Sequence, residues 1–153
     1  MGVYAGIENA EPMSGGVYFE PGLYIVLINA CKGRRTRKGA DAFIAETTIL
    51  QSSNSERPPG VHCTWMQTSD KEGWLGRVRG FCAEASDAEV KEVDEPAVEA
   101  IVSSANPLEG VVIRAEAQNV KTKAGGIVTA IRWQRMDAAE QEDWRKKATG
   151  LAA

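Results

Sequence analysis

Residues 23–50 read LYIVLINACKGRRTRKGADAFIAETTIL. The stretch contains the apolar run Leu23–Ile28, the basic segment Lys32–Gly39 and the run Phe43–Leu50. The first run is apolar on both faces and rich in β-branched residues, which is typical of a central strand, and the last run is predicted as its antiparallel partner. The basic segment is too long for a two-residue turn, so we expect it to project as a basic finger between two strands.

A similar arrangement recurs later in the chain. The segments Leu108–Val120 and Ile127–Met136 are predicted as a second hairpin around the basic loop Lys121–Gly126. A further strand is predicted over Val61–Gln67, after a loop rich in Ser, Asn and Pro. The sequence therefore predicts two hairpins, each with cations between its strands.

Helical spacing of apolar residues appears between the third and fourth predicted strands. Over Lys71–Ser86 the apolar residues recur at helical spacing, and Asp70 is a candidate N-cap. The acidic stretch Asp87–Ser104 has an apolar stripe and predicts one or two short helices broken at Pro96. Its carboxylates form either a solvated helix face or a surface that repels nucleic acid and engages basic partners.

The predicted order is strand, strand, strand, helix, strand, strand. This is the connectivity of the OB fold, a small, partly open five-stranded barrel. We therefore expect a mainly β protein in which a helical insertion separates strands three and four. The predicted divisions are an N-terminal arm at residues 1–18, an OB-fold single-stranded DNA-binding domain at residues 19–136 and a C-terminal helix or tail at residues 137–153.

Cations are concentrated although the 153-residue chain carries a net charge of −3. Bunched cations repel one another, so a polyanionic partner is expected. Single-stranded nucleic acid needs cations for its phosphates and aromatic faces for its bases. The DNA-binding candidates are Lys32, Arg34, Arg35, Arg37, Lys38, Phe43, Trp65, Lys121, Lys123, Arg132, Trp133 and Arg135, with Tyr24 as a further stacking candidate. Alternatively, the charged tips are simply solvated and Phe43 is a core residue.

Motifs that announce catalysis are missing from the sequence. The chain has no phosphate-binding loop of P-loop spacing, no nucleophile elbow and no two-histidine metal motif, since His62 is its one histidine. Cys31, Cys63 and Cys82 match no zinc-ligand spacing and are interpreted as buried free thiols. We expect no enzymatic activity, no metal and no cofactor. No apolar run is long enough to span a membrane and residues 1–16 lack a signal-peptide pattern, so a reducing, cytoplasmic location is expected.

Three stretches resemble the OB-fold single-stranded DNA-binding proteins encoded by bacteriophages. The first runs from Phe19 through the basic segment to Thr47, the second is Gly73–Phe81, and the third combines Gly110–Ile113, Lys121–Gly126 and Thr129–Trp133. The resemblance implies sequence-tolerant binding of single-stranded DNA in viral replication or recombination, in the host cytoplasm, without a cofactor. It also implies replication or recombination proteins as partners.

The C-terminal segment departs from that functional class. Many of its members end in a strongly acidic tail that recruits partners, whereas residues 137–153 carry charges of both signs. Other interpretations therefore stay open. They are a viral structural or protein-interaction module with a β-barrel core, and a small enzyme without a recognisable site. Barrel edges also leave room for a homodimer.

Overall fold

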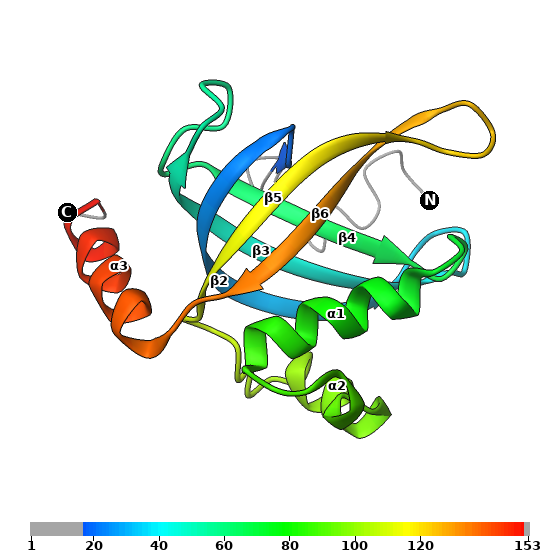
Figure 1. Ribbon diagram of the computed structural model, residues 1–153. Coiled ribbons are helices and arrows are strands. Elements are labelled where there is room, and N and C mark those ends of the chain that lie inside the picture. Colours follow the sequence, from blue (N-terminus) through cyan, green and yellow to red (C-terminus); the bar gives the residue numbers. More distant parts are fainter. Residues whose placement is uncertain (1–16, 152–153) are drawn as a thin grey trace, which may run out of the picture.

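A strongly curled, six-stranded β-sheet dominates this computed structural model, which describes residues 17–151 (Figure 1). The strands are β1 (Val17–Tyr18), β2 (Gly22–Arg35), β3 (Asp41–Ser52), β4 (His62–Thr68), β5 (Val112–Lys121) and β6 (Ile127–Arg135). The helices are α1 (Trp74–Ser86), α2 (Glu95–Ile101) and α3 (Ala138–Leu151), with a short 3-10 turn at Val90–Glu92. The strand order is β1-β4-β3-β2-β5-β6, and the sheet forms a half-barrel. The prediction of a mainly β protein is confirmed.

The short strand β1 makes the sheet six-stranded, whereas five strands were predicted. It pairs in parallel with β4, placing Val17 beside Cys63 and Tyr18 beside Thr64. The sequence allows either a flexible arm or a short leading strand over residues 1–19, because two residues are too few to show the alternation by which a strand is recognised. The remainder of the predicted arm, residues 1–16, lies outside the described residues.

The central strand β2 explains the curl of the sheet. It pairs with β3 over most of its length and with β5 over its first half, in both cases antiparallel. The β2–β3 register shifts between Ile25 and Val26 and again between Ile28 and Ala30. Such bulges bend a strand and increase its twist, which turns the sheet towards a barrel.

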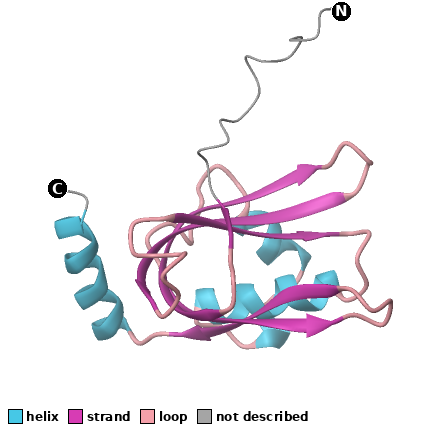
Figure 2. Ribbon diagram, turned by 90° about the horizontal axis from the view of Figure 1, so that it is seen from above, coloured by secondary structure: helices cyan, strands magenta, loops and turns pink. Residues whose placement is uncertain are grey.

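Aromatic rings fill the inner face of the half-barrel and join its two sides. Trp65 on β4 and Trp133 on β6 lie 5.4 Å apart between ring centroids, although these strands are not neighbours in the sheet. Phe81 of α1 is 5.1 Å from the Trp65 ring and 4.8 Å from the Trp133 ring. Helix α1 therefore lies within the curl (Figure 2). Its Phe81 ring completes the packing between β4 and β6.

Helix α3 packs against the outer face of the sheet. Its Trp144 and Ala148 cover a second apolar cluster that includes Ile25, Leu50 and Val112. Arg145 Nε donates a hydrogen bond to the Gly110 carbonyl oxygen at 2.7 Å, which fixes the helix beside the start of β5. Residues 138–151 are thus a docked helix, one of the two predicted alternatives. No helix in residues 17–151 is long and apolar enough to cross a membrane.

The starts of two helices differ from the prediction. Helix α1 starts after Gly73, whose φ of +79° suits glycine, and no side chain caps it, so the prediction that Asp70 is its N-cap is wrong. Pro96 lies in the first turn of α2, where its missing N–H costs nothing, and therefore does not break a helix. Asp94 caps α2, since its Oδ1 accepts a hydrogen bond from the Ala97 N–H at 3.0 Å.

Replacing Phe81 by Ala should destabilise the protein by about 3–5 kcal/mol, because it removes a fully buried ring from the seam between β4 and β6. Urea unfolding followed by far-UV circular dichroism measures the change. Leu75→Ala is the control on the same helix, since this exposed side chain should matter by no more than about 0.5 kcal/mol. Equal losses for the two variants would contradict the role of the ring cluster.

Candidate nucleic-acid interface

The β2–β3 hairpin is longer than predicted and its turn is shorter. Residues 32–35 of the predicted loop belong to β2, where Gly33 pairs with Phe43 and Arg34 with Ala42. The turn itself spans Thr36–Ala40. Strand pairing thus carries the cationic residues outward on a rigid ladder, so the expected basic finger is a hairpin end and not a long loop.

Both hairpins close with the same five-residue turn. In the first, Thr36 N donates to the Ala40 carbonyl oxygen at 2.8 Å, and Ala40 N donates back to Thr36 Oγ1 at 3.1 Å. In the second, Thr122 N donates to the Gly126 carbonyl oxygen at 2.8 Å, and Gly126 N donates to Thr122 Oγ1 at 3.1 Å. The threonine hydroxyl therefore organises each tip.

A glycine occupies the fourth position of each turn. Gly39 has φ +85° and Gly125 has φ +87°, which is left-handed backbone that other residues rarely adopt. Each of these glycines donates its N–H to the carbonyl oxygen of the turn's threonine, at 2.9 Å and 3.0 Å respectively. The shared pattern Thr-x-x-Gly is present in the sequence, but its significance was missed because the two loops were read by charge alone.

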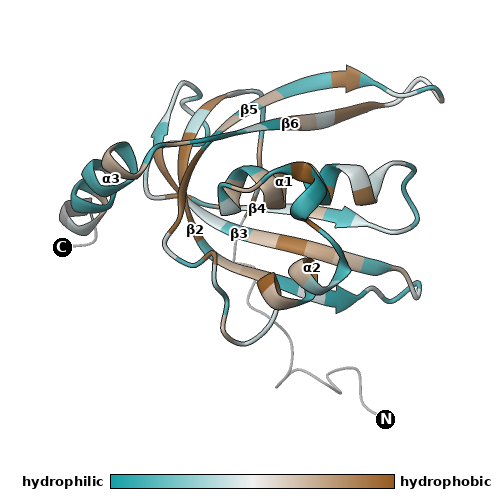
Figure 3. Ribbon diagram, turned by 60° about the horizontal axis from the view of Figure 1, so that its bottom comes forward, coloured by the Kyte–Doolittle hydropathy of each residue, from teal (hydrophilic) through white to brown (hydrophobic). Residues whose placement is uncertain are grey.

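The two tips extend from the same end of the half-barrel, as the views in Figures 2 and 3 agree. The connection between β4 and α1 lies between them (Figure 3). This connection is tied to the first hairpin, since Ser69 N donates to the Asp41 carbonyl oxygen at 2.8 Å and Asp41 N donates to Ser69 Oγ at 2.8 Å. The fold therefore brings together two basic segments that are far apart in the sequence.

Most of the cations at the tips have no carboxylate partner. Within the described residues, the following exposed side chains make no ion pair: Arg34, Arg37, Lys38, Lys121 and Lys123. Arg35 makes a loose pair with Asp41, at 3.8 Å between Nε and Oδ1, and both side chains are exposed. An anionic ligand would find these charges available.

The other three candidate cations are placed differently. Lys32 Nζ is 3.1 Å from Glu46 Oε1. Arg132 lies opposite Glu116 on the outer face of β5–β6, whereas Lys121 belongs to the opposite face. A carboxylate therefore stands across from Arg132 on the outer face of β6, and this strand does not extend the basic tip.

Arg135 is part of the scaffold. Its guanidinium binds Glu84 Oε2 at 2.6 Å, Asp87 Oδ1 at 2.9 Å and the Ala88 carbonyl oxygen at 3.0 Å. Hydrogen bonds to Glu84 and Asp87 raise the pKa of this guanidinium. These hydrogen bonds join β6 to the end of α1. The Arg135 side chain therefore has a structural role in place of the predicted DNA contact.

The aromatic stacking candidates are core residues. Phe43, Trp65 and Trp133 are 3%, 5% and 7% exposed, and Tyr24 is also buried. Register explains this: Trp65 pairs with Ala45 and Trp133 with Ala115, both buried on the inner face. No ring face of these residues is left for a base, so the prediction that they stack on DNA is wrong. The sequence showed alternation but not which face becomes the interior.

Tyr18, for which the sequence allows either packing or stacking, has an exposed ring. It is 61% exposed and pairs with Thr64, whose side chain belongs to the outer face of β4. On this face β4 is followed by β3 and then by the stretch of β2 that carries Lys32 and Arg34. An aromatic face and cations thus share one side of the sheet.

The three cysteines are free and buried, as predicted. Burial raises the pKa of Cys31 and of Cys82 to about 12, and that of Cys63 to about 11. The exposed His62 contacts Thr48 Oγ1 through Nδ1 at 3.1 Å. Within residues 17–151, no group of three or more His, Cys, Asp or Glu side chains is arranged to hold a metal ion.

Comparisons of the sequence with known proteins give no match. No family model matches this chain, and no curated protein matches its sequence.

The thiols should be inert in the native protein. We expect iodoacetamide at pH 8 to label none of them rapidly, and to label all three once urea unfolds the chain, because thiolates are the reactive form and burial disfavours them. The folded pKa values lie above the ordinary 9.0, so unfolded thiols ionise first. The free energy of unfolding should therefore be unaffected by these groups below about pH 9 and fall between about pH 9 and pH 11. Fast labelling of the native protein would contradict this.

Proposed function

We propose that this chain is an OB-fold protein that binds single-stranded DNA, without base specificity, through its two hairpin tips. The observation that carries the proposal is the pair of matching turns at one end of the molecule, whose cations lack partners within the described residues. A protein of net charge −3 that gathers unpaired cations at one end favours contact with a polyanion there.

The connectivity supports the OB-fold assignment. Strands β2, β3 and β4 are sequential neighbours, α1 follows, and β5 returns to the other side of β2 with β6 beyond it. In OB folds, ligands lie against the second and third strands and the loops after the first and fourth strands. With β2 taken as the first strand, those loops are the turns Thr36–Ala40 and Thr122–Gly126.

Phosphate contact is the main source of affinity in this proposal. The tip cations displace counterions from the DNA strand. The affinity gained in this way is independent of base identity and strongly dependent on salt. Tyr18 adds a stacking surface on the outer face of β1 and β4. The resemblance to phage proteins extends the proposal to viral DNA replication or recombination in the host cytoplasm, with no catalytic step and no cofactor.

Removing two tip cations should weaken DNA binding and flatten its salt dependence. For Arg37→Ala/Lys38→Ala, the slope of log K against log salt for an oligo-dT should shrink by about 1.4, since each phosphate contact on a single strand contributes about 0.7. Anisotropy of a labelled oligonucleotide at several salt concentrations measures it. The matched control is Lys91→Ala/Lys146→Ala, which removes the same charge from exposed positions away from the tips.

A second control separates scaffold from interface. Arg135→Gln should lower the melting temperature, because its bonds to α1 are lost, while the salt slope stays unchanged. Equal slopes for the tip double variant and the wild-type protein would remove the proposal.

Substitutions of Tyr18 test whether base stacking contributes to binding in addition to phosphate contacts. Tyr18→Ala should weaken oligo-dT binding by about 1–3 kcal/mol at unchanged salt slope, whereas Tyr18→Phe should retain the affinity because the ring is kept. Loss in both variants would assign the effect to the hydroxyl, and loss in neither would restrict binding to phosphate contacts.

A further inference from the structure

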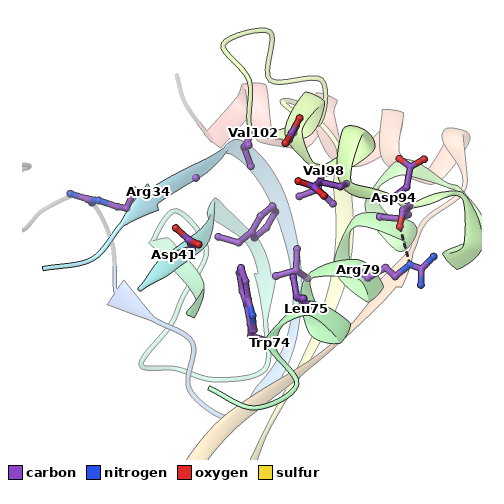
Figure 4. A pocket seen from close by; sticks show the side chains of 15 residues that line it. Arg34, Asp41, Trp74, Leu75, Arg79, Asp94, Val98 and Val102 are labelled. Carbon is purple, nitrogen blue, oxygen red and sulfur yellow. Dashed lines mark hydrogen bonds between the residues drawn. The ribbon is translucent and has the colours of Figure 1, made fainter. Parts of the chain in front are cut away.

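An apolar pocket of about 760 Å³ lies between the β2–β3 hairpin, α1 and α2. Its size falls within the range of roughly 300–1,000 Å³ that ligand pockets occupy. The apolar lining includes Phe43, Trp74, Val78, Val93, Val98 and Val102 (Figure 4). At its rim Leu75 is 66% exposed, although it stands beside this apolar surface. An apolar surface of this kind favours an apolar occupant.

The rim of this pocket is acidic. Its carboxylates come from Asp94, Glu95 and Glu99, and from Asp41, which makes the loose pair with Arg35. The two cations among the lining residues do not neutralise them: Arg34 points away from the pocket in Figure 4, and Arg79 Nε donates to the Val93 carbonyl oxygen at 2.9 Å. Within the described residues Glu95 and Glu99 make no ion pair. The pocket therefore fits an apolar segment that also carries positive charge.

The β5–β6 tip has that composition. Ile127 is 66% exposed, and Val120 and Val128 are exposed beside it, so the ribbon carries uncovered apolar side chains. Lys121 and Lys123 supply cations next to them. By contrast, the β2–β3 turn has cations without large apolar side chains, and residues 1–16 contain Glu8 and Glu11 but neither Lys nor Arg.

The tip and the pocket of one molecule cannot meet. Helix α1 lies between them in both Figure 1 and Figure 3, with the β5–β6 hairpin on one side and α2 on the other. Two complementary surfaces on different sides of one molecule join neighbouring copies head to tail, and such a contact extends into a chain unless its rotation closes a ring.

We propose that the β5–β6 tip of one molecule docks into the α1–α2 pocket of a second copy, with the tip's apolar side chains on the valine-lined floor and its lysines against the carboxylate rim. This contact does not require DNA. The interface is small, so association is weak and becomes visible at high protein concentration.

Two variants divide the contact into its halves. Ile127→Asp disables the tip and leaves the pocket intact, whereas Leu75→Asp disables the pocket and leaves the tip intact. Both positions are 66% exposed, so both proteins should fold. Leu23→Asp is the matched control, because it puts a carboxylate at a 60% exposed leucine outside both surfaces.

Sedimentation velocity without DNA, from about 10 μM to about 1 mM, is the test, since weak interfaces dissociate in this range. Wild type and Leu23→Asp should grow beyond dimers as concentration rises, and each tip or pocket variant alone should stay monomeric. An equimolar mixture of the two variants should form a one-to-one dimer and nothing larger, because one working tip meets one working pocket.

Three results would overturn the proposal: wild-type protein that stays monomeric, wild-type protein that stops at a dimer, or variants that fail to pair when mixed. Circular dichroism of each variant checks its fold before mixing. Since no DNA is present, failure here leaves the DNA-binding proposal intact, and failure of DNA binding leaves this one intact.

Discussion

The contact between the Trp65 and Trp133 rings holds together two strands that are not neighbours in the hydrogen-bonded sheet. A curled sheet of this kind has free edges, and here ring packing through Phe81 replaces the missing ladder across the opening. The direction of both hairpins follows from this seam, since β6 and β4 are held at a fixed separation. The basic tips can therefore share one end of the molecule only while the aromatic interior is intact.

Much of the fold could be predicted because its signals are local. Alternation and apolar runs located the five longer strands, and helical spacing located α1. The strands of the first hairpin were predicted to be too short. Lys32–Arg35 look like loop residues and become strand only by pairing with Asp41–Ile44. That pairing is set by the partner strand, which no local pattern of charge reveals.

The candidate site was harder to predict for the same reason. Whether Arg135 serves DNA or the scaffold depends on Glu84 and Asp87, which lie about fifty residues away in the chain. Whether the Trp65 side chain points into the core depends on the helix that fills the curl. Clustered cations can be recognised in the sequence without knowledge of tertiary contacts. The unpaired tip cations are the part of the predicted site that the structure brings together.

The β5–β6 ribbon has a consequence for local stability. From Gln118 to Ala130 every residue is exposed, so its ladder of hydrogen bonds is supported by no core. Such a segment opens at a lower free energy than global unfolding requires, so its amides exchange with solvent while the rest of the sheet stays folded. The ribbon can accordingly be lengthened, shortened or rewritten at little cost to the rest of the chain, which leaves it free to acquire a new partner.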